Sequence, residues 1–234
     1  MKFSQTLIAS ALLASAALVH AESPFSANIA LTSDYMFRGV SQTDDNPAIQ
    51  GGFDFNHESG LYIGTWASNV DFAGSGSSEH DVYIGFSKDV DNGVGFDVGM
   101  IRFIYPGSDV NLDYNEYYGS LSFSMDKVTL SGGIYYSNDV FATDETGIYY
   151  TGSVEVGVTD QVKVNAGVGL YDFDANVFGP TVGADSYVDW KLGVAAEVEG
   201  WGFDLSYVDT NDDGETLFGD AADGRVVFTV SKSL

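Results

Sequence analysis

The 234-residue sequence has no cysteine and only 4 prolines. The absence of cysteine excludes both a disulfide framework and a thiolate metal site. Proline lacks a backbone N–H, so its positions limit where paired strands can run. Pro24 precedes the first predicted strand, and Pro47, Pro106 and Pro180 fall in or beside predicted connections. The proline pattern is therefore compatible with a chain made largely of strands.

Basic residues are also scarce, since 9 Lys and Arg stand against 34 Asp and Glu, for a formal net charge of −25. Such a surface repels a phosphate backbone, which excludes nucleic acid as a partner. High net charge is also typical of disordered chains. Here, however, 14% aromatic and 44% hydrophobic residues indicate a folded protein.

Long apolar runs are missing apart from one near the start, the 13 residues of Leu7–Val19. A membrane-spanning helix needs about 20 residues. Lys2 before this run and the small residues that end at Ala21 are typical of a secretory signal peptide. We expect residues 1–21 to be a cleaved signal peptide and residues 22–234 to be an exported domain. An uncleaved membrane anchor is the alternative.

The rest of the chain alternates apolar and polar residues with a period of two, broken by Gly, Asp, Asn and Ser. This pattern predicts strands with one apolar and one polar face, and no segment after residue 21 has helical periodicity. The predicted strands cover residues 25–38, 48–57, 61–71, 80–90, 94–105, 112–123, 128–137, 147–158, 161–171, 186–198, 201–209 and 224–234.

The connections between these segments alternate in length. Tight ones such as "HESGL" and "VEGW" alternate with long ones such as "DFAGSGSSEH" and "DTNDDGETLFGDAADG". Outer-membrane barrels have short periplasmic turns and long external loops. The predicted strands also have the length of about ten residues that a tilted strand needs to cross a bilayer. The sequence therefore predicts an all-β fold, a transmembrane antiparallel up-and-down β-barrel of about 12 strands. A soluble β-sandwich is the alternative.

Turn chemistry sets the register of several predicted hairpins. In each of them the apolar faces match, as correct strand pairing requires. The predicted opposite pairs are Phe86 with Val98, Val194 with Leu205, Phe55 with Ile63, and Glu155 with Lys163 as an ion pair in the lumen.

The chain ends on a strand, "GRVVFTVSKSL", that has one apolar face. An exposed edge of this kind invites aggregation, so we expect the last strand to close on the first. Val226, Phe228, Val230 and Leu234 then face lipid, and Val227, Thr229 and Ser231 face the interior. The terminal strand is similar to the signal read by the outer-membrane assembly machinery, except that Leu234 replaces the usual aromatic residue.

The stretch from Ser33 to Phe72 resembles the N-terminal signature of the TorF-like porin family of proteobacteria. The segments that carry the resemblance are Phe37-Arg38-Gly39, Ser41-Gln42-Thr43, Pro47-Ala48, Gln50-Gly51-Gly52 and "SNVDF". The later "DYNEYYGSLSF" and "YYTGSVEVGVTDQVKVNAGVGLYDF" are similar too. The resemblance covers most of the mature chain and implies an outer-membrane barrel with a pore.

The inward alternation selects the residues that would line the lumen. Aromatic residues on this face would narrow it, and charged residues would influence its selectivity. The pore-lining candidates are Asp34, Arg38, Asp54, Trp66, Tyr83, Asp97, Tyr149, Glu155, Lys163, Tyr187, Asp189, Lys191 and Asp204. Twelve strands enclose less space than a sixteen-stranded porin, which predicts a narrow channel. An interior filled by side chains, with no transport, is the alternative.

The first predicted strand leads into a long acidic loop. By alternation Leu31 and Tyr35 face lipid, whereas Asp34, Met36 and Arg38 face the interior. An arginine among carboxylates at the outer mouth can pin the loop inward by an ion pair. A solvated arginine at the base of the loop is the alternative interpretation.

The loop "DTNDDGETLFGD" matches most of the calcium-loop pattern. Oxygen ligands at alternate positions suit Ca²⁺, and the candidate ligands are Asp209, Asn211, Asp213 and Asp220. The last of these is an aspartate where the pattern has glutamate. A chance match in an acidic, glycine-rich loop is the alternative, and we expect no other cofactor.

Histidine is scarce as well, with three in the chain. His80 with Ser77 or Ser78 raises the possibility of a lipid hydrolase, but no nucleophile elbow is present. We therefore expect no catalytic residues and no enzyme.

These observations together predict a passive channel for small hydrophilic solutes in the outer membrane of a Gram-negative bacterium. The acidic loops, including Asp212, Asp213 and Glu215, predict a preference for cations. The expected partners are outer-membrane lipid and lipopolysaccharide, the assembly machinery during insertion, and the solutes. A non-conducting structural or adhesive barrel is the first alternative, and an outer-membrane lipid hydrolase is the second.

Overall fold

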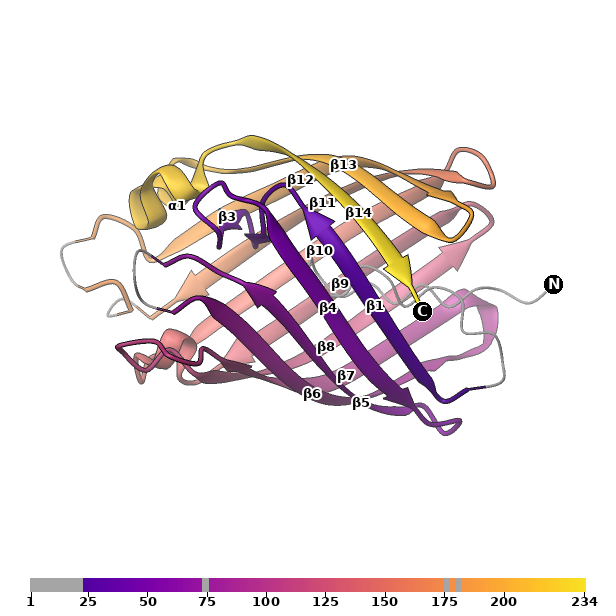
Figure 1. The fold of residues 1–234 in the computed structure, drawn as a ribbon, viewed down its shortest axis with the longest axis horizontal. Coiled ribbons are helices and arrows are strands. Elements are labelled where there is room, and N and C mark those ends of the chain that lie inside the picture. Colours follow the sequence, from indigo (N-terminus) through magenta and orange to yellow (C-terminus); the bar gives the residue numbers. More distant parts are fainter. Residues whose placement is uncertain (1–22, 73–75, 175–176, 180–181) are drawn as a thin grey trace.

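The computed structural model describes residues 23–72, 76–174, 177–179 and 182–234. In it, twelve antiparallel strands form one closed barrel in the order β1-β14-β13-β12-β11-β10-β9-β8-β7-β6-β5-β4, as Figure 1 shows. The predicted barrel and its strand number are confirmed. The expected signal peptide lies outside the described residues.

The barrel strands are β1 Phe25–Thr32, β4 Ala48–Asn56, β5 Leu61–Asn69, β6 Ser78–Asp89, β7 Val94–Ile104, β8 Tyr114–Met125, β9 Val128–Ser137, β10 Gly147–Gly157, β11 Val162–Phe173, β12 Ser186–Val198, β13 Trp201–Thr210 and β14 Arg225–Ser233. A separate two-stranded hairpin consists of β2 Met36–Phe37 and β3 Val40–Ser41. The helical segments are the 3₁₀ turns η1 Asp91–Gly93, η2 Val140–Ala142 and η3 Gly219–Ala222, and the helix α1 Asp212–Phe218.

The first and last strands close the barrel. β14 pairs with β1 in antiparallel register, with Leu31 opposite Val230 and Thr32 opposite Thr229. Every barrel strand therefore has two neighbours, which removes the exposed edge that the terminal strand would otherwise present. The prediction that the last strand needs no cover because it pairs with the first is confirmed.

Apolar side chains cover the outside of the barrel. The exposed ones include Leu31, Ile63, Ile84, Leu121, Ile134, Val168, Leu192, Leu205 and Val226. The alternate residues of the same strands point inward and are largely polar or aromatic, because successive side chains of a strand point to opposite faces. An apolar exterior around a polar interior is the pattern of a transmembrane barrel and the reverse of a soluble one.

The two ends of the barrel differ in their connections. Short turns join the strands at one end, and the long loops gather at the other end with α1 and the β2–β3 hairpin, as Figure 1 shows. We call these the turn end and the loop end. Three predicted hairpin registers are confirmed, since Phe86 lies opposite Val98, Val194 opposite Leu205 and Phe55 opposite Ile63.

The first strand is shorter than predicted. It ends at Thr32, and residues 33–47 turn back into the barrel instead of continuing the strand to residue 38. The turn between β2 and β3 has positive φ at Arg38 (51°) and at Gly39 (83°). A strand cannot continue through two left-handed residues. Tyr35, predicted to face lipid, is only 2% exposed and lies inside.

The last long loop contains α1, although no helix was predicted after residue 21. Asn211 precedes the helix in an extended conformation, and Asp212, Asp213 and Glu215 occupy its first turn. Acidic residues at that end interact favourably with the helix dipole. This interaction accounts for a helix in a segment whose apolar residues show no helical periodicity. Among the described residues, none of the helices has the length and apolar character needed to cross a membrane.

Candidate functional site: the plugged barrel interior

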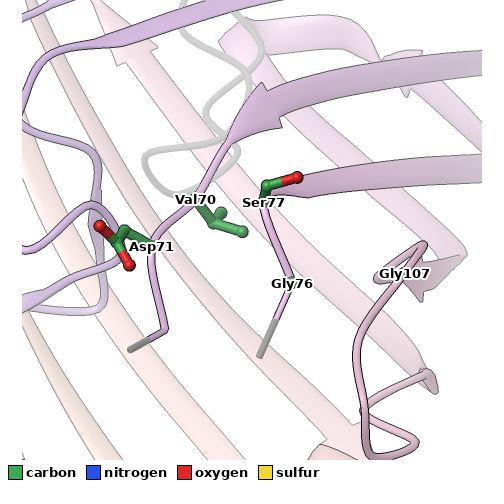
Figure 2. Close-up of a pocket in the computed structure, with 5 residues that line it drawn as sticks. All are labelled: Val70, Asp71, Gly76, Ser77 and Gly107. Atoms are coloured by element: carbon green, nitrogen blue, oxygen red, sulfur yellow. The ribbon is translucent and has the colours of Figure 1, made fainter. Parts of the chain in front are cut away.

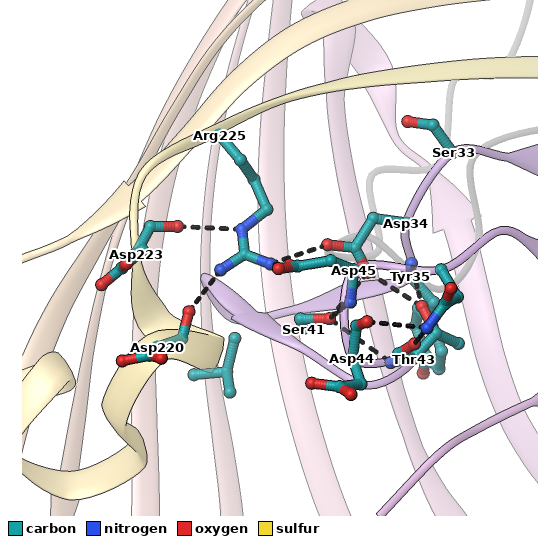
Figure 3. A network of polar contacts seen from close by, with 12 residues as sticks. Ser33, Asp34, Tyr35, Ser41, Thr43, Asp44, Asp45, Asp220, Asp223 and Arg225 are labelled. Atoms are coloured by element: carbon teal, nitrogen blue, oxygen red, sulfur yellow. Dashed lines mark hydrogen bonds and ion pairs between the residues drawn. The ribbon is translucent and has the colours of Figure 1, made fainter.

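Residues 33–47 fold into the loop end of the barrel, and we call this segment the plug. Asp34 organises it, because one carboxylate oxygen accepts hydrogen bonds from Ser41 Oγ at 2.7 Å and Thr43 Oγ1 at 2.8 Å. The Thr43 hydroxyl accepts in turn from the Tyr35 backbone N–H at 3.1 Å, as Figure 3 shows. The polar residues of the plug therefore form their own network inside the barrel.

An ion pair fixes the plug to the wall. Arg38 Nη2 lies 2.7 and 2.8 Å from the two carboxylate oxygens of Glu116 on β8, and each side chain is only 2% exposed. Burial lowers the pKa of Arg38, but the Glu116 charge and the neighbouring tyrosines together outweigh this effect and keep the pKa above the ordinary arginine value. Arg38 therefore stays charged. The predicted inward ion pair is confirmed, with Glu116 as its partner.

Aromatic rings surround the Arg38 guanidinium. Its central carbon lies 4.2 Å from the ring centre of Tyr149, 4.5 Å from Tyr171, 4.6 Å from Phe37 and 5.2 Å from Tyr135. Each distance falls within the range of cation–π attraction. The four rings and the Glu116 carboxylate replace the water that the buried guanidinium loses, and so compensate the cost of its desolvation.

Gly39 lets the plug approach the wall closely. A Cβ at this position would lie 2.7 Å from Asp189 Cβ and 2.7 Å from Thr210 Cγ2, closer than real Cβ atoms come. The neighbouring Arg38 carbonyl accepts a hydrogen bond from Tyr187 Oη at 2.9 Å. The tip of the plug is therefore seated against β12 and β13.

Two further contacts hold the base of the plug. Arg225, the first residue of β14, binds Asp34 Oδ2 at 3.1 Å and also pairs with Asp45, as Figure 3 shows. Tyr35 Oη donates to Glu79 Oε1 on β6 at 2.8 Å. Burial raises the pKa of Tyr35 well above its usual value and the Glu79 carboxylate raises it further, so the phenol keeps the proton that it donates.

Aromatic side chains fill the space around the plug in the loop half. Phe103 stacks on Tyr114 with ring centres 4.5 Å apart, and Tyr35 of the plug meets Trp66 edge-on at 5.4 Å. Tyr114 and Phe103 are each 1% exposed. Here the plug and the wall aromatics pack like a protein core.

Tyrosine–carboxylate pairs lie in the barrel interior beyond the plug. Tyr83 Oη donates to Asp54 Oδ1 at 2.5 Å, and Tyr62 Oη donates to Asp97 Oδ1 at 2.7 Å. Tyr118 contacts the Tyr62 hydroxyl. Large side chains thus narrow the lumen beyond the plug.

The turn half of the interior is more polar and more accessible. Lys163 Nζ lies 2.8 Å from Glu155 Oε1, and Lys191 Nζ lies 3.3 Å from Asp204 Oδ1. Both lysine side chains remain more than two-fifths exposed, at 45% and 44%. The predicted Glu155–Lys163 ion pair exists, but the register is different: Glu155 lies opposite Asn165, so the pair is diagonal.

The pore-lining candidates form two groups. Asp34 and Arg38 belong to the plug, and Trp66, Tyr149, Tyr187 and Asp189 lie beside it on the wall. Asp54, Tyr83, Asp97, Glu155, Lys163, Lys191 and Asp204 lie on the inner faces of their strands, where they form separate pairs.

Three buried carboxylates were missed at the sequence level. Glu79 and Asp81 on β6 are each 2% exposed, and Glu116 on β8 is 1% exposed. The signal was present, since Glu79 and Asp81 share the alternation of Tyr83, a pore-lining candidate. Glu79 was assigned to an acidic loop instead, and Asp81 and Glu116 were not among the candidates.

The structure does not bring the four candidate calcium ligands together. Residues 212–218 are helical, so they do not form the open loop that the pattern requires. Asp209 accepts a hydrogen bond from Tyr207 Oη, and Asn211 Nδ2 donates to Asp213 Oδ2 at 2.9 Å, while Asp220 lies beyond the helix. Across the part of the chain that the structure describes, no three His, Cys, Asp or Glu side chains gather to hold a metal ion.

The histidine considered for a hydrolase lies on the outer face of the barrel. His80 Nε2 is 3.2 Å from Ser78 Oγ, and the side chain is exposed. The two residues stand two apart on one strand, where side chains always share a face. This contact requires no catalytic explanation.

An open pocket of about 370 Å³ lies at the loop end, lined by Val70, Asp71, Gly76, Ser77 and Gly107, as Figure 2 shows. Asp71 is the one ionisable residue among these five, and its backbone N–H donates to the Gln42 carbonyl of the plug at 2.8 Å. The pocket therefore borders the plug, and its described lining residues include no pair of reactive groups.

Two solved structures with this architecture are porins. The KdgM porin has a TM-score of 0.62 at 8% identity, over 89% of this chain and 99% of the porin. The NanC porin has a TM-score of 0.57 at 9% identity, over 88% of this chain and 97% of the porin. At these identities the likeness shows the fold. A search of curated proteins found no match.

A family comparison covers nearly the whole chain. The family described as "Bacterial protein of unknown function (Gcw_chp)" matches residues 17–234.

Proposed function

The chain belongs to the Gcw_chp family of bacterial proteins of unknown function, and from its barrel we propose a channel for small hydrophilic solutes in the outer membrane of a Gram-negative bacterium. The observation that carries the proposal is the pairing of an apolar exterior with a charged, accessible turn half. Lys163 and Lys191 keep 45% and 44% of their side chains exposed within the barrel. Exposed ion pairs at this end of the barrel offer polar groups that a small hydrophilic solute can contact.

In this proposal the plug gates the channel by blocking or opening its lumen. Residues 33–47 fill the loop half, and their anchors are individual side chains, Arg38 and Tyr35 on the plug and Arg225 on the wall. A loop held by such contacts can leave the barrel while every strand keeps its neighbours. We assign the closed state to the structure and an open state to the barrel without a docked plug.

We also propose that the open channel prefers cations. The exposed residues at the loop end include Asp44, Asp45, Asp212, Asp213 and Glu215. Carboxylates around a pore mouth concentrate cations and repel anions. The porin names of the structural neighbours support the channel class and say nothing of this preference.

The cellular setting is part of the same proposal. Residues 1–21 act as a cleaved signal peptide, the loop end faces the lipopolysaccharide surface, and the assembly machinery inserts the barrel. The resemblance of residues 33–72 to the TorF-like porin family supports this setting.

The test is planar-bilayer recording of the refolded mature chain. We expect discrete single-channel steps that are rare in the wild type and several-fold more frequent in Arg38→Ala, because that variant loses the anchor of the plug. Arg102→Ala is the matched control, since Arg102 is 38% exposed and pairs only at 3.4 Å with Asp113. Absence of steps in all three folded proteins would contradict the channel.

One observation favours a second function, a non-conducting structural barrel. The plug and the wall aromatics bury each other as a core does, with Tyr114, Phe103 and Tyr171 each 1% exposed. In that case Arg38→Ala lowers stability without raising conductance, so the same recordings separate the two functions.

A further inference from the structure

We propose that the wall opposite the plug is a binding site for a small organic cation of the guanidinium class, and that Arg38 occupies this site in the closed state. The wall site consists of Glu116, Tyr135, Tyr149 and Tyr171. The inference deepens the proposed channel function, on which it rests, by assigning a solute class to its lumen.

The wall site belongs to the barrel and not to the plug. Its four residues come from β8, β9, β10 and β11, which are consecutive neighbours in the sheet. Tyr149 lies directly opposite both Tyr135 and Tyr171 in the ladders. Because strand pairing holds these side chains, the carboxylate and the three rings keep their places when the plug leaves.

The chemistry of the wall site suits an organic cation. A planar guanidinium matches the two oxygens of a carboxylate, and Arg38 Nη2 contacts both Glu116 oxygens at 2.7 and 2.8 Å. The faces of Tyr149 and Tyr171 lie 4.2 and 4.5 Å from the guanidinium carbon. Aromatic faces attract weakly hydrated organic cations, which lose their water more easily than a compact ammonium or a metal ion.

Arg38 does not satisfy the site fully. Its Nε and Nη1 are buried without hydrogen-bond partners, and so is Asp189 Oδ2 nearby. Its backbone also lies in the left-handed region, with φ at 51°. A tethered side chain cannot turn to reach that oxygen, because the plug fixes its backbone. A free cation has no such restraint and can use the acceptor that Arg38 leaves unpaired.

Occupation of the site by Arg38 and by a solute is mutually exclusive. The plug is joined to β1 at one end and β4 at the other, so Arg38 stays at a high effective concentration near the wall, which is millimolar or more for short linkers. A free cation therefore competes poorly with the docked plug and binds well after undocking. By linkage, a cation that binds the wall site stabilises the undocked state by the same factor.

The test measures binding of methylguanidinium to the refolded chain by calorimetry, beside the recordings. We expect Arg38→Ala to bind about tenfold or more tightly than the wild type, because the intramolecular competitor is gone. The double variant Arg38→Ala with Glu116→Gln should lose that binding, and Arg102→Ala should match the wild type. Methyl phosphate, an anion of similar size, should not bind any of these proteins.

Folding is checked by the mobility shift between unboiled and boiled protein on a gel. If Arg38→Ala alone refolds poorly, methylguanidinium should raise its refolding yield and methyl phosphate should not. A folded Arg38→Ala that binds no more tightly than the wild type would overturn the inference, as would an unrescued refolding defect. Binding without conductance would refute the channel and leave the site standing, whereas conductance without binding would refute the site alone.

Discussion

At the residue scale, burial decides what an ion pair does in this barrel. Arg38 and Glu116 are each 2% exposed, whereas Lys163 and Glu155 keep 45% and 24% of their side chains exposed. Removing one partner of a buried pair leaves an uncompensated charge and costs about 3–5 kcal/mol. An exposed pair contributes about 0–1 kcal/mol. The same kind of contact therefore fixes a loop at one level and adjusts the charge of the lumen at another.

Glu116→Gln should release the plug. The neutral amide leaves the Arg38 charge buried without its counter-charge, so docking of residues 33–47 should weaken by about 3 kcal/mol. Protease cleavage within the plug of the detergent-solubilised protein measures this, and cleavage should become much faster.

Glu155→Gln is the matched control for that substitution. It removes the same charge from the accessible turn half and should change cleavage of the plug by less than about twofold, because Glu155 pairs with Lys163 of the wall and not with the plug. Equal cleavage rates in the two variants would mean that the Arg38–Glu116 pair does not anchor the plug.

At the element scale, each strand has one face for lipid and one for the lumen. Leu205 lies at the middle of β13 and is 53% exposed on the outside, opposite Val194 of β12. Ser153 lies at the middle of β10 on the inner face, between Ser131 and Gly167. Both positions lie mid-strand, and their surroundings are opposite.

Leu205→Arg should destabilise the barrel in lipid by about 2–4 kcal/mol, because it places a charge at the bilayer midplane. Ser153→Arg should be much milder, since its charge enters a polar lumen among small neighbours. Equilibrium unfolding in lipid vesicles measures both. Comparable losses for the two variants would show that the assignment of the two faces is wrong.

The strands were predictable because their information is local. Period-two alternation and turn residues predicted all twelve strands. Matching the apolar faces of neighbouring strands predicted that Val194 lies opposite Leu205. The plug was not predictable in the same way. Its strands β2 and β3 have two residues each, and Arg38 meets a partner 78 positions later in the chain. No local pattern encodes a contact of that range.

The alternation of inward and outward residues predicted only part of the plugged interior. It placed Arg38 and Tyr149 inside, and reasoning from charge gave Arg38 an inward ion pair. The identity of Glu116 as the partner depends on how far β8 lies from β1 around the closed barrel, which only the structure supplies. The same limit explains Tyr35, which follows the end of β1 at Thr32 and belongs to the plug, so strand periodicity does not set its direction.

At the scale of the whole molecule, closure joins the two ends of the chain. Leu31 of β1 lies directly opposite Val230 of β14. The native chain has no cysteine, so a pair of introduced thiols reports on this contact without interference. Directly opposite residues on antiparallel strands have Cβ atoms about 4.5–5.5 Å apart, near disulfide distance.

The variant with Leu31→Cys and Val230→Cys should form an intramolecular disulfide on mild oxidation, seen as a reductant-sensitive mobility change in boiled protein. Leu31→Cys with Val226→Cys is the control, because Val226 lies four residues further along the strand and out of reach. If the control cross-links as readily as the test pair, the register between β1 and β14 is incorrect.

Charge is the second property of the whole molecule. With a formal net charge of −25 and acidic loops at one end, the open channel should be cation-selective at low salt. Screening shortens the reach of these charges from about 10 Å at 0.1 M to about 3 Å at 1 M, so selectivity should fall as salt rises. Reversal potentials under a salt gradient measure it, and neutralising Asp212, Asp213 and Glu215 should weaken it. An anion preference at low salt would contradict the proposed mouth.

The contact of Arg225 with Asp34 and Asp45 also has a consequence for the order of assembly. Arg225 begins the last strand, whereas the plug follows the first strand, so this anchor cannot exist until both ends of the chain have met. The Glu116 anchor needs β8 in place as well. The complete set of plug anchors thus exists only in the closed barrel. A barrel that stalls before β14 has paired lacks the Arg225 contacts, and we expect its plug to be held less firmly than that of the finished protein.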